Sequence, residues 1–470
     1  MSRIFNSFGL GLILLSSAPG WSQEAPTAPV PAVTGGGSLD TGINDSVNSP
    51  QDTDRMLTPP PMSGASYPVS FTSEQRSNYL RGGVAFNSAY SDNVLGTTAS
   101  GHPASDISYS VWPTIAIDQN LSRLHWVLSY APGFTFYQRE SSYNEADQTL
   151  SLNFQYRLSP HVTLSARDAF QKSSSVFNQP DPGAAQAVSG GIAEPNQSVI
   201  APIADQLSNS GNVGLSYQFA ANTMVGASGT FANLHYPNPS EVPGLFDSEA
   251  QGGSAFYAVR VSRMHYIGAT YEYQRLLSFP GAKTNLTQTH ALLAFYTLYV
   301  NSRVSLSAFG GPQYAEVGPQ YAAIGAAPVP GSNSWNPAAG ASLSWQARRS
   351  NLAVSYARVI SSGGGLIGAV LSDSAAASVR QQILPRLTGS LTGGYAQNDL
   401  LASAPLNSGN GHSISGTASL QQQFGQHFNL QLGYTRLHQD YGSVAVLAAT
   451  PNTNREFISV SYQFARALGR

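Results

Sequence analysis

Apolar and polar residues alternate along most of this chain. Near the C-terminus, Ile458, Val460, Tyr462 and Phe464 are separated from one another by single polar residues. The same alternation recurs in short segments from about residue 78 onward. A period of two is that of a β-strand whose two faces meet different surroundings. The pattern therefore predicts an all-β chain.

Two kinds of connection join these segments. Eight are tight turns of a few residues that contain Asn, Ser, Pro, Gly or Gln, as hairpin turns do. The others are mostly long, for example 172–205, 236–252 and 317–333. This asymmetry is typical of outer-membrane barrels, and it predicts a transmembrane antiparallel up-and-down β-barrel of about 18 strands. The tight turns are Gln119–Ser122, Ser159–Pro160, Ala220–Thr223, Ser262–His265, Val300–Arg303, Ala347–Asn351, Gln382–Arg386 and Phe424–His427.

The composition is poor in charge. Only 10% of the 470 residues are charged, and the formal net charge is −2. Ser, Thr, Asn, Gln and Gly supply the polarity, which suits a barrel with an apolar outer wall and a wet, largely neutral interior. A polar solenoid or a secreted β-sandwich has a similar composition. The balanced charge gives no basic stripe for nucleic acid. The absence of cysteine excludes disulfides and thiolate metal sites.

The positions of the aromatic residues favour the membrane barrel over the soluble sandwich. Tyr217, Trp345 and Phe464 lie close to the short turns or to the C-terminus, whereas Tyr90 and Tyr236 lie toward the long loops. Two aromatic belts are expected at the two interfaces of a membrane barrel. A sandwich would concentrate its aromatic residues in the middle of the strands.

The segment before the alternating region predicts export. Residues 1–22 combine a basic start, a short apolar stretch and small residues before a cleavage position near Ser22, which is the pattern of a secretory signal peptide. Residues 23–72 are rich in Pro, Gly and Ser and have no apolar periodicity, so we predict a disordered periplasmic leader. The barrel would then occupy residues 73–470.

Stretches near the start of the alternating region resemble a known family. They are residues 90–94 (YSDNV), 105–113 (SDISYSVWP) and 128–134 (LSYAPGF) with Tyr137. These segments resemble the β-barrel porins of Gram-negative envelopes, specifically the second of the families that carry that name. The resemblance implies an outer-membrane barrel over residues 78–470, and some relatives are linked to polysaccharide export. It implies no catalytic or ligand-binding residue.

The two-faced strands also assign residues to the interior. A charge on the lipid face near the bilayer midplane costs about 2–4 kcal/mol, so strand charges are expected to face inward. One interpretation, which we favour, is that these charges merely pair or become solvated within the wall. The other is an arginine-bearing constriction that biases the pore toward anions or sugar hydroxyls. The candidates for the lumen lining are Arg81, His125, Arg167, Arg260, Glu272 and Arg380.

No enzyme signature is present in the sequence. There is no Gly-rich phosphate loop and no Gly-x-Ser-x-Gly elbow between a strand and a helix, and the His residues are scattered. We therefore predict no catalytic residue, no metal site and no cofactor. Loop 172–205 could fold back and narrow the lumen, although an exposed position is slightly favoured.

These features predict a porin-like channel in the bacterial outer membrane that passes small polar solutes or carbohydrate passively. One alternative is a dedicated exopolysaccharide export barrel. Another is a non-conducting structural or surface-display barrel that binds partners through its long loops. The expected partners are outer-membrane lipid and the barrel-insertion machinery, with polysaccharide added for an export channel and no nucleic acid. The substrate and the choice between monomer and trimer stay open.

Overall fold

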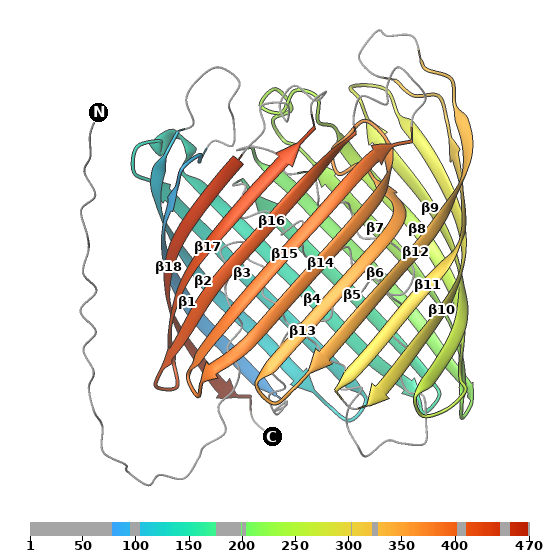
Figure 1. Ribbon diagram of the computed structural model, residues 1–470, viewed down its shortest axis with the longest axis horizontal. Helices are drawn as coiled ribbons and strands as arrows, with labels where there is room; N and C mark the ends of the chain where they lie inside the picture. The colour runs from blue at the N-terminus through green and yellow to red at the C-terminus, as the bar shows by residue number, and fades with distance from the viewer. Residues whose placement is uncertain are drawn as a thin grey trace.

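Eighteen β-strands form one sheet that closes on itself as a barrel (Figure 1). The computed structural model describes residues 78–94, 104–174, 199, 204–301, 303–321, 328–401, 410–441 and 452–468. The predicted signal peptide and leader lie outside the described residues. The strands are tilted against the barrel axis, as closure of a sheet requires.

The strands run in chain order around the barrel. Their bounds are β1 (Tyr79–Ser91), β2 (Asp106–Asn120), β3 (Leu124–Tyr137), β4 (Glu145–Ser159), β5 (Val162–Ser173), β6 (Gln206–Ala220), β7 (Thr223–His235), β8 (Asp247–Arg260), β9 (His265–Phe279), β10 (Asn285–Asn301), β11 (Val304–Val317), β12 (Ser332–Gln346), β13 (Ser350–Ser362), β14 (Ala369–Leu384), β15 (Leu387–Leu400), β16 (Gly411–Phe424), β17 (Phe428–Asp440) and β18 (Asn452–Ala467). A 3-10 turn, η1 (Ser141–Tyr143), lies between β3 and β4. Among the described residues, no helix is long and apolar enough to cross a membrane.

Every strand pairs antiparallel with both of its neighbours, and β1 closes the barrel by pairing with β18. The predicted strand number and the eight predicted tight turns are thereby confirmed. We call the end that carries these tight turns the turn end, and the opposite end the loop end. The β1–β18 ladder runs in register from Tyr79 opposite Ala467 to Ser91 opposite Arg455. The sheet therefore has no exposed edge.

The two faces of the wall have opposite character. On β1, Phe86 faces outward with 55% of its surface exposed, while the neighbouring Asn87 faces inward and is 7% exposed. The ladder registers carry this alternation to the next strand, where Val111 lies opposite Phe86 and Ser110 lies opposite Asn87. Large apolar side chains are thus exposed and small polar ones buried, the reverse of a soluble protein.

One part of the interior is packed like a protein core. Buried apolar side chains from β7 to β13 meet on the inward face, and Phe256 and Tyr266 pack against them. We call this group the apolar lumen cluster, and its buried members are Met224, Ala258, Ala291, Leu293, Phe295, Phe309, Ala338 and Val359. The sequence-based expectation of a neutral, hydrophilic lining is therefore wrong for this part of the wall.

Aromatic rings in the barrel repeatedly cover glycines on neighbouring strands. The Phe295 ring on β10 occupies the space that a side chain at Gly268 on β9 would need, and Phe309 does the same for Gly340. Such pairing fills the gap that a glycine leaves in a sheet and fixes the register of the two strands. Further pairs of this kind are Trp112 with Gly133, Phe256 with Gly226, Phe457 with Gly433 and Phe464 with Gly82.

Replacing Gly268 by Ala tests this packing. The new methyl group would overlap the Phe295 ring, so we expect a loss of roughly 1–3 kcal/mol in the free energy of unfolding, as for other overpacked cores. Gly229→Ala is the control, because the nearest atom to its new methyl group is the Gly252 oxygen at 3.9 Å. Urea unfolding in lipid vesicles measures both. Equal losses in the two variants would contradict the proposed role of the ring.

Candidate functional site

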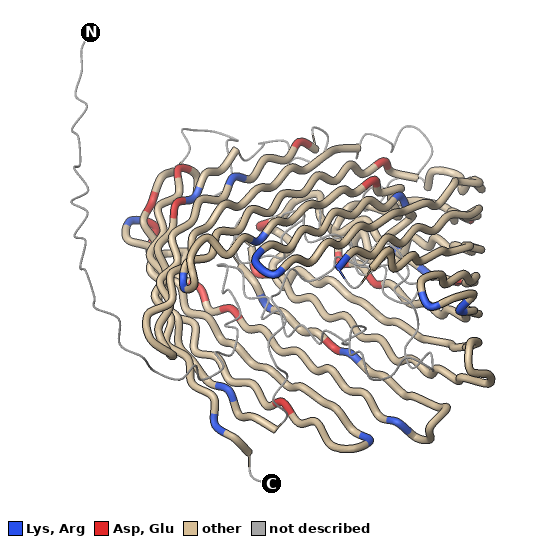
Figure 2. The backbone as a smooth tube through the Cα atoms, turned by 60° about the horizontal axis from the view of Figure 1, so that its bottom comes forward, with Lys and Arg blue, Asp and Glu red and all other residues tan. Residues whose placement is uncertain are grey.

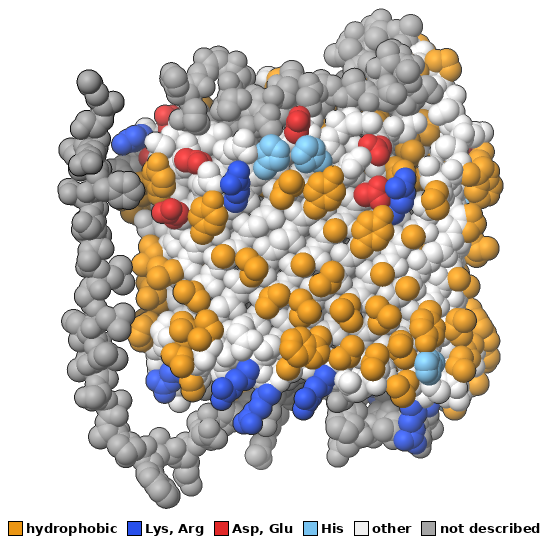
Figure 3. All heavy atoms as spheres, in the orientation of Figure 1, with side chains coloured by type: hydrophobic (Ala, Val, Ile, Leu, Met, Phe, Trp, Pro, Cys, Tyr) orange, Lys and Arg blue, Asp and Glu red, His pale blue; other side chains and the backbone are white. Residues whose placement is uncertain are grey.

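The outer surface of the barrel is matched to lipid. Exposed aromatic and aliphatic side chains form a broad belt, which Figure 3 shows in orange on one face of the molecule. Ile115, Phe134 and Leu215 are examples from three different strands. A soluble monomer rarely exposes a continuous apolar patch of more than a few hundred Å². This surface is stable when an apolar solvent surrounds the belt. Polar chemistry is then confined to the interior of the barrel.

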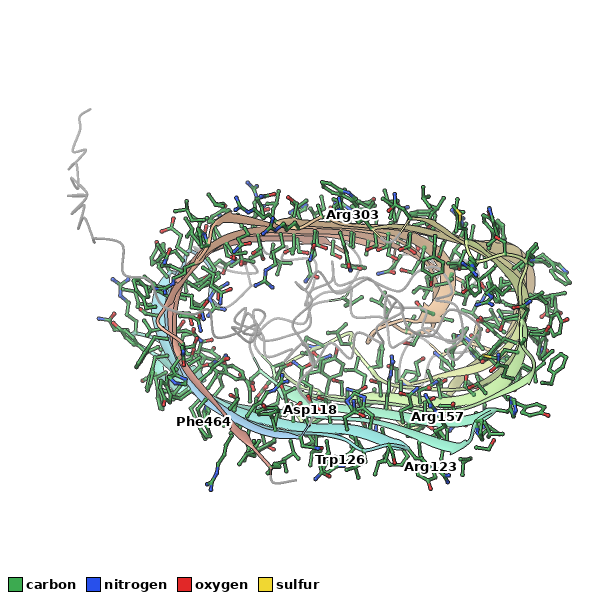
Figure 4. The ribbon with its side chains drawn as sticks, turned by 90° about the horizontal axis from the view of Figure 1, so that it is seen from below. Asp118, Arg123, Trp126, Arg157, Arg303 and Phe464 are labelled. Atoms are coloured by element: carbon green, nitrogen blue, oxygen red, sulfur yellow. The ribbon has the colours of Figure 1, made fainter. Side chains whose placement is uncertain are left out.

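The inward face from β14 through β18 and on to β6 is a polar wall of Ser, Thr, Asn and Gln side chains. Hydroxyl groups pair across neighbouring strands, for example Ser129 with Ser151 at 2.6 Å and Ser390 with Ser419 at 2.7 Å between Oγ atoms. Seen from the turn end, the barrel is oval (Figure 4). The polar wall and the apolar lumen cluster thus give two parts of one lumen opposite character.

The β13–β14 hairpin leaves the wall at the loop end. Pairing between β12 and β13 stops at Ala339 opposite Arg358, whereas β13 and β14 stay paired as far as Ser362 opposite Ala369. We call residues 359–371 the inserted hairpin. All of them except Ile367 and Gly368 are buried. Their burial follows because the hairpin turns inward instead of continuing along β12.

Polar side chains of β9, β10 and β11 hold the inserted hairpin. The carbonyl oxygen of Ile367 accepts hydrogen bonds from Ser278 Oγ at 2.5 Å and from Asn285 Nδ2 at 2.8 Å. The Ile360 N–H donates to Gln313 Oε1 at 3.1 Å. Ile360 also packs with Leu276 and other buried apolar residues. The hairpin therefore crosses from β13 to the wall formed by β9, β10 and β11.

The tip of the inserted hairpin fits under the β7–β8 loop. Gly364 and Gly365 have φ values of 61° and 101°, which residues with a side chain rarely adopt. The Gly365 carbonyl accepts a hydrogen bond from the Phe246 N–H at 2.8 Å. A side chain on Gly365 would meet the Tyr236 hydroxyl at 2.7 Å. The turn and the close approach both require glycine.

Loops from several hairpins bury a small core over this tip, which we call the loop-end cluster. Its buried members are Val199, Ala204, Leu234, Tyr236, Val242, Leu245, Leu366, Val370, Leu400 and Tyr441. Tyr236 was expected in the aromatic belt toward the long loops. It is instead 2% exposed inside this cluster. Burial raises the pKa of its hydroxyl above the ordinary value, and the nearby Asp247 carboxylate raises it further, so the phenol stays neutral.

Two of the predicted lumen residues meet at the turn end through an aspartate. Arg81 and His125 occupy inward positions on β1 and β3, and Asp118 of β2 lies between them. One Arg81 guanidinium nitrogen is 3.2 Å from Asp118 Oδ2, and His125 Nε2 is 3.4 Å from Oδ1. Asp118 thus compensates the charge of Arg81, which is the simpler of the two interpretations drawn from the sequence. Figure 4 labels Asp118 together with the outward-lying Trp126.

The other three predicted arginines are spread around the barrel. Arg167 lies opposite Asn153 and Asn212 on the flanking strands and is exposed toward the interior. Arg260 lies at the end of β8, and its Nε donates to Asn222 Oδ1 at 3.1 Å. Arg380 lies near the turn end of β14, six strands farther along the sheet. The structure does not bring these arginines together in one ring.

Glu272 differs from the other predicted residues because it is buried. It is 7% exposed and lines a small cavity beneath the inserted hairpin, together with Gln274, Gln313, Val359 and Ile360. Its Oε1 has no hydrogen-bond partner among the described residues. Glu272 therefore belongs to the packed part of the lumen and not to the polar wall.

Two features of the lumen were missed by the sequence analysis. Ile115 and Ile117 face outward, and Asp118 is the next residue in the same alternation. Its inward position could therefore have been predicted from the pattern. The inserted hairpin coincides with a run of apolar residues, 366–371, that follows three glycines and interrupts the alternation. Loop 172–205, the predicted candidate for narrowing the lumen, lies mostly outside the described residues.

The hydrogen bonds to Ile367 can be tested by labelling. The chain has no cysteine, so a single Leu366→Cys reports only the inserted hairpin. We expect a membrane-impermeant maleimide to react slowly with it, and on the order of tenfold faster after Ser278→Ala with Asn285→Ala, since each lost hydrogen bond is worth about 1 kcal/mol.

Ser390→Ala with Asn429→Ala is the matched control, because these inward side chains belong to the polar wall. It should leave the labelling rate unchanged. Rapid labelling of Leu366→Cys in an otherwise unaltered chain would show that the hairpin is not seated as described.

No family model and no curated protein matches the chain. Among solved structures, the ferric citrate transporter FecA in the unliganded form is similar, with 10% identity and a TM-score of 0.42, covering 83% of this chain and 79% of FecA. OccK2 (OpdF) of Pseudomonas aeruginosa has 12% identity and a TM-score of 0.41, covering 84% of this chain and 100% of OccK2. OpdL of Pseudomonas aeruginosa has 12% identity and a TM-score of 0.39, covering 82% of this chain and 98% of OpdL. At these TM-scores the similarities do not bear on the function of the chain, and the resemblance to a porin family stays a prediction.

Proposed function

We propose that this chain is an outer-membrane channel through which small polar solutes diffuse along the polar wall of the lumen. The observation that carries the proposal is the combination of an apolar outer belt with an inward wall of hydroxyl and amide groups in one closed barrel. Barrels of 16–18 strands generally leave an aqueous channel, which supports an open path in the polar part. No bond-making step is involved.

The two parts of the lumen have different roles in this proposal. The apolar lumen cluster and the inserted hairpin fill the side formed by β7 to β13, and the solute passes along β14 to β18 and β1 to β6. Ser and Thr hydroxyls and Asn and Gln amides both donate and accept hydrogen bonds, so they replace water around a sugar or another neutral solute. Arg167 is an exposed charged side chain on this path, and none of the ion pairs among the described residues involves it.

The loop-end cluster favours one second candidate, a barrel that is closed at this end and does not conduct. Its buried side chains come from loops and strand ends that meet over the tip of the inserted hairpin. In that case the long loops would bind a partner, as in a surface-display barrel. A conductance measurement separates the two candidates.

Single-channel recording in planar bilayers is the decisive experiment. We expect stable current steps from the refolded barrel, and a conductance about twofold larger when residues 363–368 are replaced by Asn-Gly, because a constriction limits the current through a pore. Heat-modifiable gel migration confirms that both barrels are folded. If neither folded protein gives current steps, the diffusion channel is excluded and the non-conducting barrel is favoured.

Ion selectivity tests whether solutes pass Arg167. Arg167→Glu reverses a charge on the proposed path, so the reversal potential in a salt gradient should shift toward cation selectivity. Arg436→Glu is the control, since Arg436 is exposed on the outward face of β17 and the shift in net charge is the same. If both variants shift the potential equally, or neither does, the path does not run along β5.

A further inference from the structure

Charge is distributed unequally between the two ends of the barrel. In the eight short connections between strands at the turn end, the first of which is 121–123, every charged residue is an arginine. These residues form what we call the arginine crown: Arg123, Arg263, Arg303, Arg348, Arg349 and Arg386. Figure 2 shows blue segments at the short turns. The loop end carries many carboxylates instead, among them Asp106, Asp247 and Asp440.

The side chains of the arginine crown are available to a partner. All six residues are exposed, and none of them forms an ion pair with a described residue. Asp118 is the one carboxylate among the described residues near this end, and it is engaged by Arg81 and His125. The positive charge of the crown is therefore not neutralised within the described part of the barrel.

Backbone hydrogen bonds, and not the guanidinium groups, hold these turns in shape. The Arg157 N–H donates to the Arg123 carbonyl at 2.7 Å, and the Gln346 N–H donates to the Arg303 carbonyl at 2.7 Å. In the same way, the carbonyl groups of Arg349 and Arg386 accept hydrogen bonds from the N–H groups of Gln382 and Gln423 on the adjacent strands. The turns thus need no contribution from the arginine side chains, which points to a different role for them.

Apolar side chains next to the crown show where it lies relative to the membrane. Leu121, Val261 and Met264 are 50%, 68% and 42% exposed, and they occupy the same turns as Arg123 and Arg263. Exposed apolar residues in a turn are unfavourable in water but favourable at the boundary of a bilayer. Their exposure favours a position of the crown at the level of lipid headgroups over one beyond them in the aqueous phase.

The aromatic residues at this end agree with that level. Trp345 is exposed on the outward face three residues before Arg348. Phe424 and Phe428 are exposed at the ends of β16 and β17, and Phe424 follows Gln423, whose N–H donates to the Arg386 carbonyl of the neighbouring turn. Figure 3 shows basic side chains along the lower edge, directly below the apolar belt. Aromatic belts mark membrane interfaces, so guanidinium groups just beyond them are expected at the depth of the phosphate groups.

From these observations we infer that the arginine crown binds the headgroups of anionic phospholipids in the leaflet at the turn end. The inference rests on the proposed membrane location but not on conduction. A guanidinium group donates two parallel hydrogen bonds to phosphate, and each basic residue near an anionic surface adds to the attraction. A soluble acidic protein would need the crown to project into water, which the exposed apolar turn residues disfavour.

Native mass spectrometry of the purified full-length protein tests this inference. The protein in neutral detergent is mixed with equal amounts of phosphatidylglycerol and phosphatidylcholine that have the same acyl chains. We expect it to retain phosphatidylglycerol preferentially. The triple variant R303Q/R349Q/R386Q should lower the ratio of the two retained lipids by about threefold or more, because three headgroup contacts are lost.

The matched control is R139Q/R275Q/R436Q, which removes the same charge from exposed arginines at the loop end. It should leave the lipid ratio unchanged. Equal retention of both lipids by the unaltered protein, or an equal loss in both triple variants, would overturn the inference. Heat-modifiable migration shows that each variant is folded. Absence of conductance with a preserved lipid preference would refute the channel alone.

Discussion

The rest of the structure depends on the complete pairing of backbone hydrogen bonds around the barrel. A strand in lipid has no water to satisfy its N–H and C=O groups, so each strand needs a partner on both sides. The ladder between β1 and β18 supplies the last pair and removes the edge. Closure in turn fixes which residues face inward, because one residue of slippage would exchange the two faces of a strand.

The inserted hairpin is the exception that shows how strict this constraint is. Once β13 leaves β12 at Arg358, backbone groups of the hairpin lose their partners in the wall. Inward polar side chains replace those partners, with Gln313 binding the Ile360 N–H and Asn285 binding the Ile367 carbonyl. The apolar lumen cluster and the loop-end cluster then cover the remaining surface of the hairpin. The polar interior thus supplies hydrogen-bond partners for buried backbone in addition to lining the proposed channel.

The two ends of the barrel differ in the way that their surroundings require. Tight turns expose few backbone groups and can lie at the membrane surface, where arginine and apolar side chains are both stable. The loop end carries longer segments that pack on one another, and carboxylates such as Asp106 accept backbone N–H groups of Ile107, Arg139 and Glu140 there. The channel and the lipid-binding surface proposed above therefore use separate parts of one wall. Neither requires the other to function.

The sequence by itself determined the strand number, the tight turns and the two faces of most strands, because a period of two and turn chemistry are local properties. Ile458, Val460 and Tyr462 identify their own strand without reference to any distant residue. Only the tertiary structure decided the path of the inserted hairpin, since Ser278 and Asn285 lie 89 and 82 positions from Ile367 along the chain. The same holds for the pairing of Arg81 with Asp118 and for the core around Phe295. Alternation says which face a side chain is on, whereas the curvature of the closed sheet decides which side chains meet across it.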